Sequence, residues 1–387
     1  MSDQNPVFIP GPTNIPETIR KACDIPTMDH RSAAFPPIYD KARAGVARVL
    51  NMGVGGEVVL FPATGTGGWE AAVTNTLAPG DKVLAARHGM FSQKWIDLCQ
   101  RHGLDVQVVE APWGAGVPVD AFAQALAADT GHAIKAVLVT HNETATGVTS
   151  DVGAVRAALD GAGHPALLMV DGVSSIASIP FEMAAWGVDV AVSGSQKGFM
   201  LPPGLAIVGL SAKALAAMQD AGLPRCFFDI RDMLSGIYPY TPPVALINGL
   251  AASTDMLLAE GMAAVAARHN RIAEGVRRAV AAWGLSPCAQ SPELYSDTVT
   301  AIVVPEGVDG NALVAHAASA YGVAFGAGLG AVAGKVFRIG HLGMMTDVMA
   351  LAGIATAEMA MADFGMDVTP GSGVAAAQAW YRETRAG

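Results

Sequence analysis

Short apolar runs rich in β-branched residues alternate with longer amphipathic runs from about residue 57 onward. The apolar runs predict strands at 57–61, 82–86, 105–110, 136–140, 166–171, 188–193 and 205–210. The amphipathic runs predict helices at 69–77, 92–102, 120–128 and 150–159. Strands separated by helices are typical of βαβ units, so we expect an α/β fold whose mostly parallel sheet carries helices on both faces.

The chain of 387 residues is long enough for two or three domains. An Ala-rich helical run at about 245–283 leads from this first series into further strands near 298–304 and 335–339. The first 20 residues are Pro-rich, and we expect them to be extended rather than part of a core. We therefore predict three parts: an N-terminal arm (1–20), a large domain (21–260) and a smaller C-terminal α/β domain (261–387).

Charge and hydropathy exclude several classes of protein. Only 15% of the residues are charged and 51% are hydrophobic, which argues against a disordered chain. The net charge of −10 argues against nucleic-acid binding, which needs basic clusters. The longest uncharged stretch, 233–254, is interrupted by prolines and polar residues, so we expect no membrane span.

The cysteines and the first residues indicate where the protein works. The four cysteines are scattered and share no CxxC spacing, so we expect neither a disulfide framework nor a metal site. The first dozen residues contain no basic segment and no apolar segment of the kind that a secretory signal has. We expect a cytoplasmic protein.

A single lysine, Lys197, follows the strand expected at 188–193, within Ser-Gln-Lys-Gly and ahead of an apolar loop. An ammonium between apolar flanks must find partners, or its pKa falls. A lysine with a lowered pKa is the usual nucleophile toward carbonyl groups, including that of pyridoxal phosphate. The alternative is an ordinary surface lysine in a loop.

An acid, Asp171, ends the strand expected at 166–171. Open α/β sheets bind ligands at the carboxyl ends of their parallel strands, which is where this carboxylate is expected to lie. Pyridoxal phosphate needs such an acid to keep its ring nitrogen protonated, because the protonated ring withdraws electrons. The alternative is an aspartate that only caps the following turn.

A Thr/Gly-rich turn, Thr64-Gly65-Thr66-Gly67, joins the first strand to the first helix of the series. Backbone N–H groups, two hydroxyls and the helix dipole make such a turn a candidate phosphate site. The turn lacks the GxGxxG pattern of dinucleotide sites and the GK[ST] of P-loops. A plain strand-to-helix turn has a similar composition.

These motifs, in this order, resemble the fold-type I pyridoxal-phosphate enzymes. Lys197 lies 26 positions after Asp171, and this spacing fits that family. The chain is most similar to the class V aminotransferases, in particular the serine–, alanine– and aspartate–glyoxylate branch, over nearly its whole length. The similar segments are Pro10–Asn14, Asp29–Ser32, Thr64–Gly67, Thr140–Gly147, Ser193–Lys197, Tyr238–Pro243 and Lys335–Gly343.

The resemblance implies roles for residues around the cofactor ring. Lys197 would bind pyridoxal phosphate covalently and then act as the base and acid of the proton transfer. Asp171 would pair with the ring nitrogen, while Val173 and Phe91 would pack on the two ring faces. Close alanine–glyoxylate relatives have a tryptophan at the position of Phe91. Thr144 would form a hydrogen bond with the 3-oxygen of the cofactor.

The resemblance also implies a phosphate site shared by two subunits of a homodimer. Gly65, Thr66 and Gln196 would hold the phosphate within one chain. Tyr238 and Thr241 would reach the phosphate of the neighbouring subunit.

For the substrate, the resemblance implies that Arg338 binds the α-carboxylate through its two-pronged guanidinium. The arm around Gly11 would close over the substrate. A dicarboxylic donor needs a second cation, and Arg31 is the candidate, although it could instead pair with Asp29. We expect transfer of the amino group of L-serine to glyoxylate to give glycine, with L-aspartate as the alternative main donor.

Two rival functions remain to be weighed. A cysteine desulfurase-like lyase of the same class needs a cysteine on a mobile C-terminal loop, and 321–334 contains none. An NAD-dependent oxidoreductase needs the GxGxxG turn and leaves Ser-Gln-Lys unexplained. A yellow chromophore bleached by borohydride would separate the pyridoxal-phosphate class from the dinucleotide class.

Overall fold

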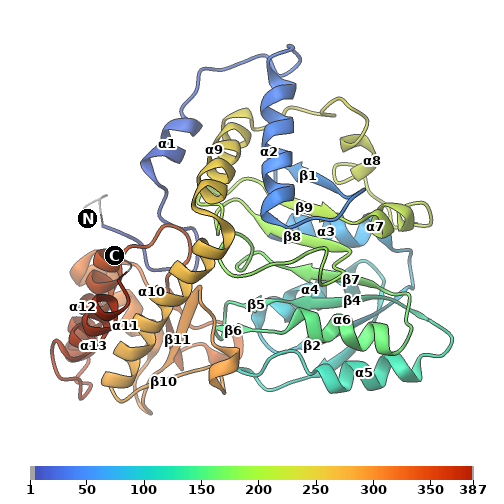
Figure 1. Ribbon diagram of the computed structural model, residues 1–387. Helices are drawn as coiled ribbons and strands as arrows, with labels where there is room; N and C mark the ends of the chain where they lie inside the picture. The colour runs from blue at the N-terminus through green and yellow to red at the C-terminus, as the bar shows by residue number, and fades with distance from the viewer. Residues whose placement is uncertain (1–4, 386–387) are drawn as a thin grey trace.

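The protein is described here by a computed structural model that covers residues 5–385. A seven-stranded sheet and a four-stranded sheet form its two centres, and helices surround both (Figure 1). A third, two-stranded ribbon consists of β5 (Asn142–Glu143) and β6 (Val148–Thr149). This arrangement confirms the predicted α/β class.

The large sheet has the strand order β1-β9-β8-β7-β4-β2-β3. Only β9 runs antiparallel to its neighbours, so the sheet is mostly parallel, as predicted. Its strands are β1 (Glu57–Phe61), β2 (Lys82–Arg87), β3 (Asp105–Glu110), β4 (Ile134–Thr140), β7 (Leu167–Asp171), β8 (Val190–Gly194) and β9 (Ala206–Leu210).

Both faces of this sheet are buried, because alternate residues of a strand pack into different clusters. In β7, Leu168 and Val170 belong to one hydrophobic cluster, whereas Leu167 and Met169 belong to the other. The first cluster contains residues of α2 (Phe35–Val49), α5 (Val119–Ala128), α6 (Val152–Gly161) and α9 (Val244–Glu260). The second contains residues of α3 (Gly65–Thr76), α4 (Met90–Arg101), α7 (Ala212–Ala217) and α8 (Ile230–Met233).

The helical run predicted at 245–283 is two helices rather than one. The second of them is α10 (Met262–Ala282), and the two axes meet at 84°. Gly261 lies between them with φ +88°, a conformation that glycine adopts without strain and that ends an α-helix. Within residues 5–385 no single helix is long and apolar enough to span a bilayer, and only this bent pair reaches that length and hydropathy.

The small sheet is antiparallel, with the order β10-β11-β13-β12. Its strands are β10 (Ser286–Pro287), β11 (Val299–Val303), β12 (Gly326–Ala327) and β13 (Val336–Gly340). The helices packed around it are α10, α11 (Gly310–Tyr321), α12 (Asp347–Asp363) and α13 (Ser372–Glu383). The strands β11 and β13 occupy the segments predicted near 298–304 and 335–339.

The N-terminal segment differs from the expected arm. Phe8 is 1% exposed and belongs to the hydrophobic cluster of the small sheet. Its backbone bonds to Ala324 and Gly340, so it lies beside the sheet as an added strand residue. A helix, α1 (Glu17–Cys23), follows. The division at 1–20, 21–260 and 261–387 stays a prediction, and residues 1–4 and 386–387 of it lie outside the described residues.

The large sheet brings distant segments together at one edge. The register pairs Thr140 with Asp171 at the ends of β4 and β7, and Asp171 with Val192 near the end of β8. Because these strands are parallel, the loops that follow them emerge at the same edge. The lysine loop after β8 therefore lies close to the acid that ends β7.

Candidate active site

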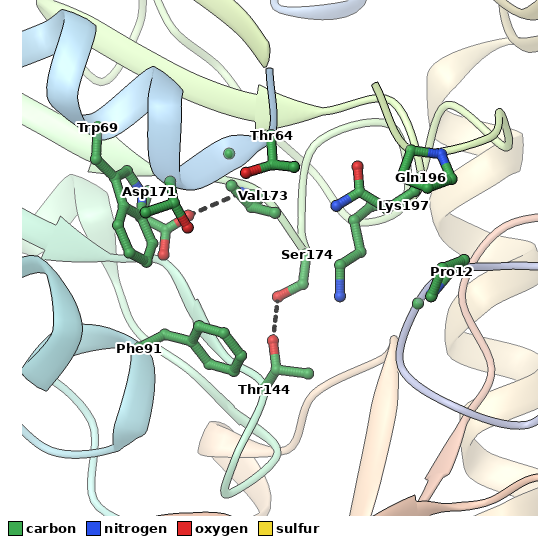
Figure 2. Close-up of a pocket in the computed structure, with 14 residues that line it drawn as sticks. Pro12, Thr64, Trp69, Phe91, Thr144, Asp171, Val173, Ser174, Gln196 and Lys197 are labelled. Atoms are coloured by element: carbon green, nitrogen blue, oxygen red, sulfur yellow. Dashed lines mark hydrogen bonds between the residues drawn. The ribbon is translucent and has the colours of Figure 1, made fainter. Parts of the chain in front are cut away.

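A cavity of about 290 Å³ opens at this edge of the large sheet. Figure 2 shows Asp171 and Trp69 on one side of the open space, Lys197 on another, and Phe91 and Thr144 along a third. The predicted site residues that line the cavity are Gly11, Thr64, Gly65, Thr66, Phe91, Thr144, Asp171, Val173, Gln196 and Lys197.

The Thr/Gly-rich turn forms the first turn of α3. The N–H of Gly68, the residue after the turn, donates to the Thr64 carbonyl over 3.0 Å and so makes the first backbone hydrogen bond of the helix. The N–H groups of Gly65 and Thr66 precede it and remain available at the positive end of the helix dipole. Only glycine fits at position 65, because a Cβ there would lie 2.4 Å from a methyl group of Val173. This end of the cavity can bind an anion.

The carboxylate of Asp171 lies at the other end of the cavity and is 4% exposed. Its Oδ1 accepts a hydrogen bond of 3.0 Å from the backbone N–H of Val173 (Figure 2). Burial raises the pKa of Asp171 to about 7, and the nearby Glu143 carboxylate adds to the rise. The indole of Trp69 acts in the opposite direction. Such a buried acid favours a cationic partner that would restore its charge.

The amine of Lys197 points into the cavity and donates a hydrogen bond to the carbonyl oxygen of Pro10. Burial lowers the pKa of Lys197 to about 8, and the positive charge of Arg338 contributes. Gly11 passes so close that a Cβ on it would lie 2.5 Å from Cδ of Lys197, and its φ is +101°. The N-terminal segment therefore covers the lysine, and a pKa of about 8 leaves about a tenth of the amine neutral at pH 7.

Arg338 lies on β13 and is 6% exposed. Its Nη1 donates to the Thr144 carbonyl over 3.0 Å, and its Nε donates to the Ala327 carbonyl over 2.9 Å. Among the described residues no hydrogen bond is made by Nη2. Burial lowers the pKa of Arg338 to about 10. The guanidinium is thus rigidly held with donors left for a ligand, as substrate binding would require.

Arg338 contacts the Thr144 backbone without lining the cavity itself. Three further predicted residues lie away from the cavity. Arg31 and Tyr238 line a second cavity of about 520 Å³, beside Phe35 and Tyr39. The Tyr238 hydroxyl donates to the Leu60 carbonyl of its own chain over 2.8 Å. Thr241 is exposed. Within one chain these residues are not part of the site.

The structure adds residues that sequence analysis did not single out. Trp69, Ser174, Pro12 and Pro203 also line the cavity. Trp69 follows the Thr/Gly-rich turn by one helical turn, and Ser174 lies three residues after Asp171, so their closeness to those motifs was the available signal. Glu143 is a further residue near the cavity that sequence analysis did not single out.

The carboxylate of Glu143 is fully buried beside the cavity. Its Oε2 accepts from the N–H groups of Phe91 and Ser92, each over 3.0 Å, at the start of α4. Its Oε1 accepts from the N–H of Ala145 over 3.1 Å. Burial raises the pKa of Glu143, and these donors oppose the rise. Glu143 therefore fixes the backbone that carries the Phe91 ring.

A buried lysine, an acid and a helix start able to bind an anion, gathered around one cavity of an α/β sheet, are the groups that a pyridoxal-phosphate-dependent enzyme needs. Residues 21–348 match the family "Aminotransferase class-V". The chain belongs to the class V aminotransferases and is a pyridoxal-phosphate-dependent transaminase.

Relatives and a solved structure agree with this assignment over nearly the whole chain. An L-aspartate–glyoxylate aminotransferase of Paracoccus denitrificans is 67% identical, over 100% of this chain and 98% of the relative. A serine–glyoxylate aminotransferase of Hyphomicrobium methylovorum is 54% identical, over 97% and 94%. The crystal structure of pyridoxamine–pyruvate aminotransferase from Mesorhizobium loti superposes with a TM-score of 0.92 at 30% identity, over 99% and 98%.

Proposed function

We propose that the protein transfers the amino group of L-serine or L-aspartate to glyoxylate and so produces glycine. The observation that carries the proposal is the position of Lys197, whose amine of lowered pKa shares one small cavity with Asp171 and lies near Arg338. Relatives that are 67% and 54% identical are named for aspartate and serine as donors and for glyoxylate as acceptor.

The residues present fit pyridoxal phosphate. Gln196 lines the cavity and its buried Oε1 has no hydrogen-bond partner within residues 5–385, so its amide is not committed to protein groups and can present its Nε2 donor to a phosphate. The phosphate would be held by the free N–H groups and hydroxyls of Thr64, Gly65 and Thr66, together with Gln196. The ring would lie between the side chains of Val173 and Phe91, with Thr144 at its hydroxyl.

The bound cofactor supplies an electron-withdrawing ring that lowers the barrier to removing the α-proton of an amino acid. Asp171, ionised beside a cationic ring nitrogen, would keep that nitrogen protonated. Lys197 would bind the cofactor through Nζ and, once released, move the α-proton with the same atom. Arg338 would orient the amino acid by its carboxylate, using the donors of its guanidinium.

The choice of donor depends on a second cation. L-aspartate carries a side-chain carboxylate, which would be costly to bury without a partner. Within one chain Arg31 lies at the second cavity rather than beside Arg338. We propose that Arg31 binds this carboxylate in the site of a neighbouring subunit, whereas L-serine needs only a hydroxyl partner.

A homodimer is part of this proposal. The segment that contains Tyr238 and Thr241 also carries the exposed apolar side chains of Phe227 (44%) and Ile237 (76%). Contact with a second copy would bury these side chains and would bring Tyr238 and Thr241 to the partner's phosphate site. We also propose a cytoplasmic location, which fits the four free cysteines in the described part of the chain.

A lyase acting like a cysteine desulfurase has less support. None of the four cysteines lines the cavity, as far as residues 5–385 show. The aromatic Phe91 lies where that chemistry places a histidine. We therefore keep amino transfer as the conclusion.

The experiment is a donor panel with glyoxylate as acceptor, in which kcat/KM is measured for L-serine, L-aspartate and L-alanine. We expect glycine to form, with L-serine or L-aspartate as the preferred donor. Lys197→Ala should abolish turnover while the protein stays folded, whereas Lys135→Ala, at an exposed position of β4 away from the cavity, should not. Equal turnover in the Lys197→Ala protein, or sulfide release from L-cysteine in place of glycine formation, would contradict the proposal.

A further inference from the structure

Two hydroxyls, those of Thr144 and Ser174, meet at the wall of the cavity (Figure 2). Their oxygens are 2.8 Å apart, and both residues are about 5% exposed or less. Ser174 also contacts Asn142 twice: its Oγ lies 2.9 Å from the Asn142 carbonyl oxygen and 2.8 Å from the side-chain Nδ2. Ser174 thus has three polar neighbours and one proton to donate.

Counting protons fixes the direction of these bonds. The backbone carbonyl of Asn142 can only accept, so the Ser174 hydroxyl donates its proton there. The amide Nδ2 of Asn142 can only donate, so it occupies one lone pair of Ser174. What remains on Ser174 is one lone pair. The Thr144 hydroxyl must therefore donate its proton to Ser174.

The orientation of the Asn142 amide is fixed by the same neighbours. In the opposite orientation both Oδ1 and the backbone carbonyl oxygen of Asn142 would face the Ser174 hydroxyl, which has only one proton to donate. In the orientation observed, Nδ2 also donates to Thr298 over 3.0 Å, and Oδ1 accepts from Thr149 over 3.0 Å. Thr298 immediately precedes β11, so the small sheet helps to hold the network.

We propose that Ser174 is a positioning residue that commits the proton of Thr144, so that the Thr144 oxygen can only accept hydrogen bonds on the cavity side. The inference rests on the proposed function, in which Thr144 meets the ring hydroxyl of pyridoxal phosphate. If Thr144 donated to that ring oxygen, two hydroxyl oxygens 2.8 Å apart would be left with no proton between them. Ser174 therefore favours the protonated ring oxygen over the anionic one.

The consequence can be measured in the visible absorption of the holoenzyme as a function of pH. The nitrogen that would join the cofactor to Lys197 gains or loses a proton as the pH changes, and the visible absorption reports the midpoint pH of this titration. A hydrogen bond donated to the anionic ring oxygen makes that oxygen a weaker acceptor for the proton of this nitrogen. The proton is then lost more easily, and the midpoint pH falls. Ser174→Ala frees the Thr144 proton, so we expect its midpoint to lie about 1 pH unit below that of the wild type.

Thr144→Val separates the two directions without touching Ser174. If Thr144 only accepts, removing its oxygen leaves the midpoint unchanged or lower. If Thr144 donates, the same change raises the midpoint by about 1 pH unit, which would overturn the inference. In the double variant Ser174→Ala/Thr144→Val, the midpoint should return to that of Thr144→Val alone.

Ser175→Ala is the matched control. Ser175 is equally buried, but its hydroxyl bonds to His141 over 2.9 Å and does not touch Thr144. Its midpoint should equal that of the wild type. The charged groups around the site stay the same in every variant, so they cannot produce the difference; these are Glu143, Asp171, Lys197 and Arg338.

The outcomes for the inference and for the proposed function are distinct. A wild-type protein that takes up no pyridoxal phosphate, and so shows no visible band, would contradict the proposed function. If the wild type binds the cofactor and is coloured, but its midpoint pH equals that of Ser174→Ala, only the role given to Ser174 is contradicted. The donor panel would then stand unaffected.

Discussion

The Nζ of Lys197 donates a hydrogen bond to the carbonyl oxygen of Pro10, a residue 187 positions earlier in the chain. Two residues before Pro10, the carbonyl of Phe8 accepts from the N–H of Gly340 at the end of β13. The hydroxyl of Thr13 donates to the Lys197 carbonyl over 3.2 Å. The N-terminal segment therefore links the small sheet to the lysine loop and holds the amine in the cavity.

Uptake of pyridoxal phosphate by the apo-protein should depend on the charge of Lys197. Only the neutral amine attacks a carbonyl, so the association rate should rise with pH and reach half its maximum near pH 8. Arg338→Gln removes a positive charge that disfavours the ammonium, so the midpoint should move upward. Arg338→Lys keeps the charge and should leave the midpoint close to that of the wild type. Stopped-flow absorbance measures these rates, and a midpoint near 10 in the wild type would rule out the lowered pKa.

Asp171→Asn should keep the cavity but lose most of the activity. The amide oxygen can still accept from Val173, whereas a neutral side chain cannot stabilise a protonated ring nitrogen. Losing a charge-assisted hydrogen bond should lower kcat on the order of 10- to 100-fold. Steady-state kinetics at saturating cofactor check this, and an unchanged kcat would move the role to another residue.

The stability of the apo-protein should report the same carboxyl group through its pH dependence. The pKa of Asp171 is raised by burial to about 7, so the unfolded chain ionises at lower pH than the folded one. Stability contributed by the protonated acid is fully present below the unfolded pKa and is lost as the pH rises toward 7. Asp171→Asn should remove this loss, as the difference in Tm between pH 5 and pH 7 would show. A wild type and a variant with parallel Tm profiles would argue that Asp171 is ionised throughout.

Glu143 should stabilise the start of α4 and the position of Phe91. Glu143→Ala leaves three buried N–H groups without their acceptor, which should lower the free energy of unfolding by about 3 kcal/mol or more. Glu143→Gln keeps one acceptor oxygen and should lose less. Urea denaturation of the apo-proteins measures both, with the exposed Glu306→Gln as the control. If Glu143→Ala, Glu143→Gln and Glu306→Gln all have similar free energies of unfolding, the three hydrogen bonds to Glu143 contribute little to stability.

Tyr238 should act in the site of a partner subunit. A mixture of Lys197→Ala subunits with Tyr238→Phe subunits should regain activity, because each heterodimer then contains one site with a lysine and a tyrosine. Tyr240→Phe, which alters a neighbouring hydroxyl bonded to Phe227, should by itself keep near-normal activity. Activity is compared before and after subunit exchange, and exchange without any gain would place Tyr238 in the site of its own chain.

Arg31 should distinguish the two donors. If it binds the second carboxylate, Arg31→Ala should lower kcat/KM for L-aspartate on the order of 30-fold or more and change that for L-serine little. Arg48→Ala, another exposed arginine, should affect neither donor. Equal losses for both donors would give Arg31 a structural role.

Local sequence patterns were sufficient to predict the strands of the large sheet, the strands β11 and β13 of the small sheet and two central site residues, but not the two-residue strands β5, β6, β10 and β12. Lys197 and Asp171 each follow or end an apolar run, and a parallel sheet places the ends of its strands at one edge, so their proximity followed from order alone. The same patterns could not locate the break at Gly261, because an Ala-rich run on both sides reads as one helix. Nor could they show that Phe8 is buried, since its partners lie more than 300 residues later.

The sequence by itself determined the α/β class, the order of the site motifs and the resemblance to class V aminotransferases, because these depend on short-range patterns and on residue identity. Tertiary structure alone decided which side chains share a cavity and how strongly their charges are perturbed. The pKa values of Asp171 and Lys197 depend on burial, and the direction of the Thr144 proton depends on neighbours at positions 142 and 174. Burial and hydrogen-bond direction are properties of atoms packed together from separate segments, so no local pattern contains them.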